Sequence, residues 1–268
     1  MENTYYLCPI CQQALQQKDK QLICEANHSF DVAKEGYVNL LPVQFKKSKA
    51  PGDNKDMVIA RRNFLEKGYY SPLAKKLISL VNQFSPNAEY LLDAGCGEGY
   101  YTEKHASQDR QIYGVDIAKE AIKRAAKRHK ECHFSVGTLS NLPFSEASFD
   151  WVYSIYAPII EKEFTRLLKP SGYLLTVTPA KNHLFELKSI IYREAKAHDD
   201  EKLPIAQMNL VHQEQLTYQL ELNEVEDRFN LLAMTPFAFK RSENLTQMLE
   251  KMDSFSCTAD FLIRIYQK

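Results

Sequence analysis

From residue 89 onward, short apolar runs alternate with amphipathic stretches, and this alternation limits the possible fold more than any other feature. Helical patterns occur at 100–106, 119–130 and 161–169. The apolar runs around them are EYLLDAG (89–95), QIYGVDIA (111–118), CHFSVG (132–137), FDWVYSIY (149–156) and GYLLTVTP (172–179). Strands that alternate with helices in this way predict an α/β fold with a doubly wound parallel sheet.

The C-terminal third is less regular. Residues 186–198 (ELKSIIYREAKAH) have a helical pattern. After this helix we expect late strands and a connecting insertion within QLTYQLELN (215–223), NLLAMTPFAF (230–239) and FLIRIYQ (261–267). Boundaries in this part of the chain are predicted only to within several residues.

The N-terminal part divides into two segments before the alternation begins. Residues 1–45 are rich in cysteine and turns and are too few to bury a large core. Residues 46–85 hold a basic linker and two expected helices, one after Pro51-Gly52-Asp53 and one from Pro72. We therefore divide the chain into 1–45, 46–85 and 86–268.

Composition excludes several classes of protein. The 34 Lys and Arg residues balance 34 Asp and Glu residues, so the overall charge gives no sign of nucleic acid binding, and the local distribution of charge has to decide that question. No window approaches the 18–20 or so apolar residues of a membrane span, which argues against a membrane partner. The start MENTYYLCPI shows neither a basic leader nor an apolar stretch, and we expect a cytoplasmic, reducing location. There, the six cysteines are better explained as metal ligands or free thiols than as disulfides.

A glycine loop follows the first strand of the alternation. Asp93, Gly95, Gly97 and Gly99 form the pattern D-x-G-x-G-x-G between a strand and a helix. Glycines allow a tight turn and the close approach of a ligand to the backbone. The spacing differs from the G-x-G-x-x-G that receives a pyrophosphate, and no Gly-Lys-Ser/Thr of a Walker loop follows. An acidic Asp93 at the loop entrance favours a cationic group, such as an amino acid's ammonium. A purely structural turn is the alternative.

A second acidic residue narrows the ligand. Asp116 ends the second strand, 21 residues after Gly95, where a carboxylate accepts hydrogen bonds from ribose hydroxyls. An amino-acid end at the loop and a ribose at Asp116 together describe S-adenosylmethionine. The sequence therefore predicts Asp93, Gly95, Gly97, Gly99 and Asp116 as cofactor-binding residues.

The N-terminal cysteines have the spacing of a zinc site. Cys8 and Cys11 form C-x2-C, and Cys24 and His28 follow as C-x3-H. Three thiolates and one imidazole make a closed tetrahedral shell, which indicates one structural Zn²⁺ ion and no catalytic position. The metal would supply much of the folding free energy of so small a segment. Chance occurrence of four unrelated residues is the alternative.

The basic linker is a candidate nucleic-acid-binding segment. Residues 46–76 carry nine Lys or Arg against three Asp or Glu. A solvated, charged linker is the alternative explanation of this stretch. The candidate phosphate contacts are Lys46, Lys47, Lys49, Lys55, Arg61 and Arg62.

The segment 89–180 resembles the class I S-adenosylmethionine-dependent methyltransferases. Beyond the glycine loop, the resemblance includes Leu142-Pro143-Phe144 and the LLKPSGYLL turn. It implies a Rossmann-like, mostly parallel seven-stranded sheet with one late antiparallel strand. One departure is Thr138, which stands where the superfamily often has an acidic residue near adenine.

Nearly the whole chain resembles one family within that class, the bacterial 23S rRNA (guanine-N1)-methyltransferases of the RlmA family. The shared motifs are CPICQQAL, HSFDVAKEGYVNLLPVQ, PGDNKDMVIARRNFL, GYYSPL, LDAGCGEGYYT and the late MTPF. The resemblance implies methylation of guanine N1 in an rRNA hairpin loop, RNA binding by the zinc module, and a homodimer. It also implies cofactor contacts by Tyr70, Gly97, Glu98 and His183.

The residues after the fourth strand agree with a ring nitrogen as methyl acceptor. Ser154-Ile155-Tyr156-Ala157-Pro158 replaces the N/D-P-P-Y/F tetrad of many enzymes that methylate exocyclic amines. No cysteine nucleophile lies near the fourth or fifth strand, as methylation of pyrimidine carbon 5 would require. Guanine N1 carries a proton at neutral pH, so a base or a donor that stabilises the enolate is needed. Tyr156 and His183 are the candidate catalytic residues.

Two other functions remain open at this stage. A methyltransferase acting on a small molecule or another RNA could carry a structural zinc module, although the basic linker argues against the former. An RNA-binding or resistance factor could retain the fold without activity, although Asp93, the loop glycines and Asp116 are intact. Which guanine is the target does not follow from any residue.

Overall fold

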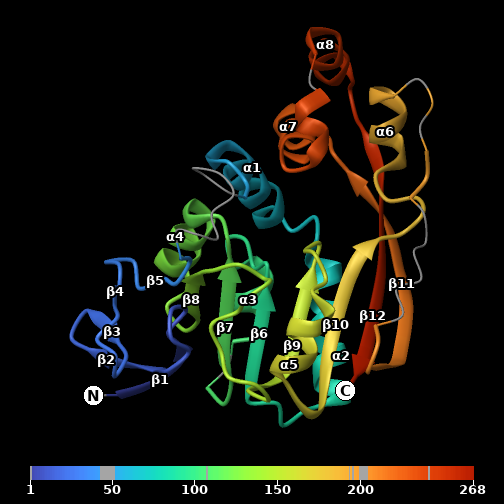
Figure 1. Cartoon of the computed structure of the whole chain (residues 1–268). Helices are drawn as coiled ribbons and strands as arrows, with labels where there is room; N and C mark the ends of the chain where they lie inside the picture. The colour runs from blue at the N-terminus through green and yellow to red at the C-terminus, as the bar shows by residue number, and fades with distance from the viewer. Residues whose placement is uncertain are drawn as a thin grey trace.

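The computed structural model describes residues 2–42, 52–106, 108–192, 194, 196–198, 205–240 and 242–268. Its centre is an eight-stranded sheet in the order β11-β12-β10-β9-β6-β7-β8-β5 (Figure 1). A separate four-stranded sheet forms the N-terminal module. Among the described residues, no helix combines the length and the apolar character that a bilayer crossing needs.

The central sheet is mostly parallel, as predicted. Its parallel core consists of β6 (Tyr90–Ala94), β7 (Gln111–Asp116), β8 (His133–Val136), β9 (Phe149–Ile155) and β10 (Leu168–Pro179). One late strand, β12 (Ser256–Gln267), runs antiparallel to both of its neighbours, β10 and β11 (Asn209–Glu221). The prediction of one late antiparallel strand is thus confirmed. The eighth strand, β5 (Val38–Asn39), comes from the N-terminal module and pairs with β8.

Alternating residues of the strands build two separate cores, one on each face of the sheet. Leu91 and Trp151 belong to one hydrophobic cluster, and their neighbours Leu92 and Val152 belong to the other. This alternation is the expected pattern for a sheet that is covered on both sides. The helices nearest the core are α2 (Ser71–Phe84), α3 (Tyr100–Lys104), α4 (Lys119–Arg128) and α5 (Glu161–Leu167).

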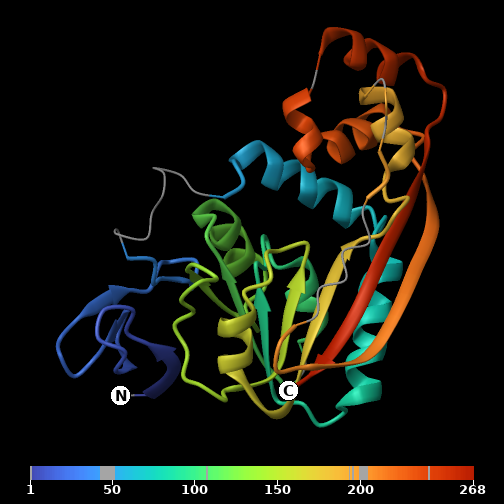
Figure 2. The same ribbon diagram turned by 45° about the vertical axis from the view of Figure 1, so that its right-hand side comes forward.

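The helix expected after Pro51-Gly52-Asp53 is α1 (Lys55–Glu66), and it lies across the upper end of the parallel strands (Figure 2). The Asn54 side chain caps it by accepting a hydrogen bond from the Met57 N–H at 3.0 Å. The helix expected from Pro72 is α2, which has proline in its first turn. Both predictions are confirmed.

The last part of the chain builds a cap, which we define as α7 (Val225–Ala233), η2 (Pro236–Lys240) and α8 (Glu243–Lys251). It stands with α6 (Phe185–Ile191) at the far end of β11 and β12 (Figures 1 and 2). Residues 230–239 belong to the expected connecting insertion between the late strands, because they complete α7 and form η2 between β11 and β12. Leu232 packs in one cluster with Leu245 and Leu249 of α8, so helical packing decides the outcome.

A buried arginine holds the cap together. Arg228 is 1% exposed, and its guanidinium donates hydrogen bonds to backbone carbonyls just before α7 and at the end of α8. The acceptors are the carbonyl oxygens of Leu222, Asn223, Leu249, Met252 and Asp253. Because these carbonyls end β11 and α8, one side chain satisfies several otherwise orphaned groups.

The N-terminal module is docked on the β8 side of the central sheet. Its strands are β1 (Glu2–Leu7), β2 (Ala14–Lys18), β3 (Gln21–Ile23) and β4 (Ser29–Asp31). Tyr5 stacks on Tyr90 with ring centroids 4.6 Å apart, and Tyr6 packs on Phe144 at 5.2 Å. The Leu7 N–H donates to the Pro143 carbonyl at 2.8 Å. Aromatic packing and strand pairing therefore fix the module to the large domain.

Candidate functional site

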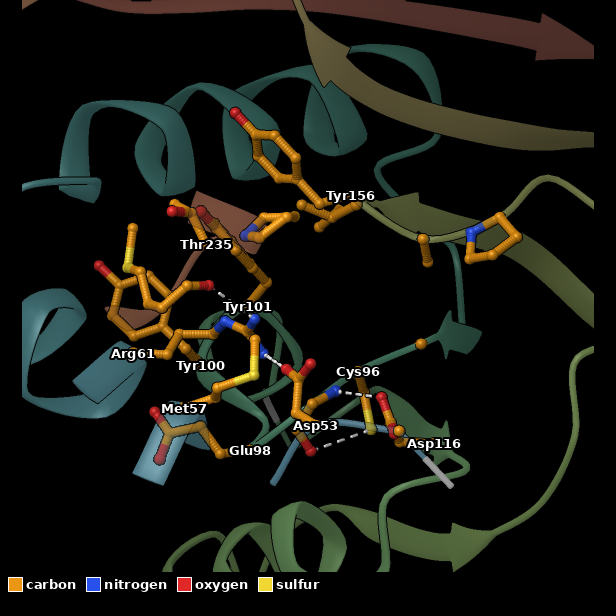
Figure 3. Close-up of a pocket in the computed structure, with 18 of the residues that line it drawn as sticks. Asp53, Met57, Arg61, Cys96, Glu98, Tyr100, Tyr101, Asp116, Tyr156 and Thr235 are labelled. Atoms are coloured by element: carbon orange, nitrogen blue, oxygen red, sulfur yellow. Dashed lines mark hydrogen bonds and ion pairs between the residues drawn. The ribbon is translucent and has the colours of Figure 1, made fainter. Parts of the chain in front are cut away.

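A cavity of about 820 Å³ opens at the carboxyl ends of the parallel strands (Figure 3). The chain leaves β6 for β7 on one side and returns to β9 on the other, so the strand order reverses here. Ligands of doubly wound proteins bind at such a reversal, and the volume suits a small organic ligand. Helix α1 and the cap complete the wall through residues that include Met57, Arg61, Met234 and Phe237.

The glycine loop forms the floor of the cavity. Gly95, Gly97 and Gly99 have φ angles of +87°, +55° and +84°, in the left-handed region that favours glycine. A Cβ on Gly95 would lie 2.5 Å from the Ala157 Cβ, so this glycine is also required for packing. A Cβ on Gly97 would have only the Arg61 Nη1, at 4.0 Å, within reach. The backbone at Gly97 is therefore open to a ligand.

Asp116 joins the loop to the end of β7. Its Oδ2 accepts the Gly97 N–H at 2.9 Å, and its Oδ1 accepts the Ala118 N–H at 2.7 Å. Each carboxylate oxygen has a second lone pair, and Asp116 lines the cavity. Burial raises its pKa, while the two backbone hydrogen bonds oppose that shift. The residue is thus placed to accept hydrogen bonds from a pair of hydroxyl groups.

Asp93 occupies a different position from the one expected at the loop entrance. It is 2% exposed and is not among the described residues that line the cavity. Its Oδ2 accepts the Thr102 hydroxyl hydrogen at 2.7 Å, and burial raises its pKa to about 7. The carboxylate therefore supports the loop and the first turn of α3 from below.

Glu98 is the acidic residue of the loop that does line the cavity. It is 3% exposed, and the Arg128 Nη1 lies 3.3 Å from its Oε2. Burial raises the pKa of Glu98 to about 7, and the positive charge of Arg128 limits the shift. This carboxyl group can therefore change its charge near neutral pH.

Tyr156 and His183 meet at the cavity wall, where they follow β9 and β10. The Tyr156 hydroxyl lies 3.2 Å from the His183 Nε2, and Tyr156 adopts a left-handed φ of +55°. The Asp260 N–H donates to the His183 Nδ1 at 3.1 Å. Burial lowers the pKa of His183 to about 3, and the positive charges nearby act in the same direction. The buried Tyr70 packs edge-on against Phe261, with ring centroids 5.0 Å apart, and lines the same cavity.

Several lining residues were not singled out from the sequence. His198 lines the cavity with its ring 6.4 Å from that of His183, although no local pattern marks it. Asp53 also lines it, where the sequence suggested only a break before a helix. The cap contributes 234–237, the MTPF motif, whose role its sequence did not reveal.

The expected RNA contacts separate into different environments. Lys55 is exposed at the start of α1, and Arg62 is half-buried with its Nη2 3.4 Å from the Asn63 Oδ1. Arg61 instead enters the cavity, where it pairs with Asp53 and donates to the Met234 carbonyl. The remaining predicted contacts, Lys46, Lys47 and Lys49, lie outside the described residues.

Thr138, which departs from the superfamily pattern, also lines the cavity. Its Oγ1 lies 3.0 Å from the Ser140 Oγ, so the two hydroxyls share a hydrogen bond. The position is therefore polar but uncharged, and it offers hydroxyl groups in place of a carboxylate.

The four predicted metal ligands converge in the N-terminal module. The ligand atoms of Cys8, Cys11, Cys24 and His28 all lie within 4.8 Å of one another. The Cys11 and Cys24 sulfurs are 3.6 Å apart, and the His28 Nδ1 is 3.5 Å and 3.4 Å from the sulfurs of Cys8 and Cys24. A tetrahedral zinc ion with Zn–S of about 2.3 Å separates its ligand atoms by roughly 3.5–3.8 Å. The donor set and spacing therefore fit Zn²⁺.

Two family models match the chain. Residues 6–49 match the zinc ribbon described as RlmA, N-terminal, and residues 92–176 match the family described as methyltransferase domain. The first match covers the four metal ligands, and the second covers the glycine loop and Asp116. These matches agree with the zinc-binding and S-adenosylmethionine-binding assignments.

Similar proteins extend the match over nearly the whole chain. YxjB of Bacillus subtilis, named provisionally as a 23S rRNA (guanine-N(1)-)-methyltransferase, is 30% identical over 98% of this chain and 97% of its own. The 23S rRNA (guanine(748)-N(1))-methyltransferase of Streptomyces fradiae is 34% identical over 68% of this chain and 66% of its own. A Bacillus halodurans structure, named provisionally as a methyltransferase, has a TM-score of 0.50 at 17% identity, covering 71% of this chain and 98% of that one. The last likeness concerns the fold alone.

Removal of one metal ligand tests the zinc assignment. The Cys24→Ala variant is expected to lose the single zinc ion, because three remaining ligands bind Zn²⁺ far less tightly. Elemental analysis of the purified protein measures the metal content per chain. Cys132→Ala is the control, because this buried thiol lies outside the cluster. Equal zinc contents in the two variants would refute the assignment.

Proposed function

Because the chain belongs to the family of 23S rRNA (guanine-N1)-methyltransferases, we propose that it methylates N1 of a guanine in 23S rRNA. The methyl donor is S-adenosylmethionine, and the target guanine lies in a hairpin loop. The observation that carries the proposal is a relative's match over 98% of the chain, which includes both the zinc cluster and the glycine loop.

The cavity supports the choice of methyl donor. Asp116 presents a carboxylate to the ribose hydroxyls, and the open backbone at Gly97 leaves room for the amino-acid part. Glu98, Tyr70 and His183, which the resemblance implies as cofactor contacts, all line the same cavity. When bound, S-adenosylmethionine would supply a methyl group on a sulfonium: the S–C bond would break as the N–C bond forms, S-adenosylhomocysteine would leave, and the guanine N1 proton would pass to solvent water.

The alternative of a small-molecule methyltransferase is less well supported. Such an enzyme has no need of a zinc module, whereas here the module contributes β5 to the central sheet and packs on it through Tyr5 and Tyr6. The exposed Lys55 and the basic residues of the linker are proposed to neutralise RNA phosphates. A homodimer and a cytoplasmic location are proposed on the family resemblance.

Hydrogen bonding decides which atoms of Tyr156 and His183 carry protons. The His183 Nδ1 accepts the Asp260 N–H, so it carries no proton of its own. A pKa near 3 keeps the ring neutral at physiological pH, and its one proton is therefore on Nε2. That N–H donates to the Tyr156 oxygen, which leaves the tyrosine hydroxyl hydrogen free to donate into the cavity.

From this arrangement we infer complementary roles for the two residues. His183 has no lone pair left to accept a proton, so it serves to orient Tyr156. The tyrosine is not a base either, because a phenol keeps its proton at neutral pH and the packing of this side chain in the cavity wall raises its pKa further. As a donor, Tyr156 would stabilise the negative charge that develops on guanine O6 when N1 loses its proton.

Ribosomal RNA provides the direct test of the function. N1 methylation blocks Watson–Crick pairing, so reverse transcription of 23S rRNA stops beside the modified guanine. A strain lacking this gene is expected to lose one such stop, and the wild-type gene should restore it. The Asp116→Ala variant should not restore the stop, because the ribose contact is lost. If every stop persists in the deletion strain, the proposed function is wrong.

The Glu98 pKa predicts proton release on methyl-donor binding. Near pH 7 about half of the Glu98 carboxyls are protonated, and a cationic ligand favours the charged form. Affinity for S-adenosylmethionine is therefore expected to rise with pH, by up to about eightfold between pH 6.0 and 7.5 for one such group. Calorimetry in buffers of different ionisation enthalpy measures the protons released. Glu98→Gln should release fewer, and identical release from both proteins would contradict the assignment.

Removal of one hydroxyl group tests the role of Tyr156. Tyr156→Phe should lower the methylation rate at saturating substrates by about 10²-fold or more, since loss of one oxyanion donor costs that much. The dissociation constant of S-adenosylmethionine should change little. Tyr153→Phe is the control, because this buried hydroxyl on β9, the strand that precedes Tyr156, has no hydrogen-bond partner among the described residues. Equal rates for the two variants would exclude Tyr156 as the donor.

A further inference from the structure

Arg61 projects from the second turn of α1 into the cavity and is held there by two partners. Its Nη1 pairs with the Asp53 carboxylate, as the dashed line in Figure 3 shows. Its Nη2 donates to the Met234 carbonyl of the cap at 3.1 Å. The side chain is 31% exposed, which is low for an arginine near the surface. An RNA phosphate contact, as predicted from the sequence, does not require this inward position.

The charges around Arg61 make it unusual in this cavity. It is the single Lys or Arg among the described lining residues, whereas Asp53, Glu98 and Asp116 supply three carboxylates. Burial raises the pKa of Glu98 and of Asp116, and the positive charge of Arg61, which lines the same cavity, opposes part of that rise. A ligand with a negative group therefore finds one strong partner here.

Arg61 also has donors to spare. A guanidinium carries five N–H groups, and the bonds to Asp53 and Met234 engage only two of them. The Nη1 lies 4.0 Å from the position of a Cβ on Gly97, where the backbone is open to a ligand. The unused donors are thus beside the part of the glycine loop that receives the amino-acid end of the methyl donor.

We propose that Arg61 binds the α-carboxylate of S-adenosylmethionine, an inference that rests on the proposed function. A carboxylate accepts two parallel hydrogen bonds from a guanidinium, and these charge-assisted bonds are stronger than neutral ones. The interaction adds a specific contact for the zwitterionic end of the ligand, on the other side of the sulfonium from the ribose contact of Asp116.

Asp53 is the positioning residue for this contact. Gly52, which precedes it, has a φ of +85°, and a Cβ there would lie 2.8 Å from the Ala118 Cβ. This close approach holds the chain before Asp53 against Ala118, two residues after the end of β7. The ion pair with Asp53 then orients the Arg61 guanidinium toward the loop.

Two forms of the ligand separate this role from a general effect on the cavity. Decarboxylated S-adenosylmethionine keeps the sulfonium, the ammonium and the ribose but has no α-carboxylate. Calorimetric titration of wild type and Arg61→Gln with both ligands gives four dissociation constants. We expect the variant to bind S-adenosylmethionine about 10- to 100-fold more weakly. Its affinity for the decarboxylated ligand should fall by less than about threefold.

The outcomes that would overturn the proposal are distinct. An equal loss for both ligands would show that Arg61 maintains the cavity without touching the carboxylate. If the variant keeps its affinity for both ligands but binds rRNA more weakly, Arg61 contacts an RNA phosphate instead of the carboxylate. If wild type binds neither ligand, the proposed function itself fails, whereas tight wild-type binding with an unaffected variant overturns only this inference.

Two controls complete the experiment. Arg124→Gln removes an arginine of α4 that pairs with Glu120 outside the cavity, and it should bind both ligands as wild type does. Arg61→Lys retains the charge but not the planar pair of donors, and it should recover only part of the affinity for S-adenosylmethionine. Circular dichroism of each variant verifies that it is folded.

Discussion

The hydrogen bonds of Asp116 to the N–H groups of Gly97 and Ala118 tie the ends of β6 and β7 together, and the site depends on this junction. The glycine loop requires left-handed backbone angles at three positions, which cost conformational entropy on folding. A carboxylate that accepts two backbone hydrogen bonds holds the turn in that shape. The same carboxylate faces the cavity, so one side chain both fixes the loop and offers a polar partner to the ligand.

A second network supports the opposite wall. Asp260 is fully buried, and its carboxylate accepts hydrogen bonds from Gln215, Thr217 and the Asn182 N–H. These bonds account for its low pKa in spite of burial. Its backbone N–H sets the tautomer of His183, and thereby the direction of the hydrogen bond to Tyr156. A late antiparallel strand, β12, thus orients the side chains at the end of a parallel one, β9.

Much of the fold could be predicted because its signals are local. Each strand from β6 to β10 is a short apolar run, and α2 shows a clear helical stripe. The cap could not be predicted as well. Residues 230–239 are apolar and contain a proline, and this pattern does not distinguish a helix from a strand. Their packing against Leu245 and Leu249, together with the carbonyls gathered by the buried Arg228, decided for helix. Those partners lie outside residues 230–239, so the local pattern of this segment does not reveal them.

The sequence by itself determined the chemistry of two groups of residues. One is the glycine loop with Asp116, which indicates the methyl donor, and the other is the C-x2-C and C-x3-H pairs, which indicate zinc. In both, the spacing along the chain dictates the geometry, because ligands on one turn or on adjacent strand ends must lie together. Only the tertiary structure decided which charged groups face the cavity. Asp93 lies beneath the loop, while Arg61 points inward from α1 and His198 reaches the cavity from the segment between α6 and β11. The direction in which a side chain points depends on its neighbours in space, and the order of residues does not specify those neighbours.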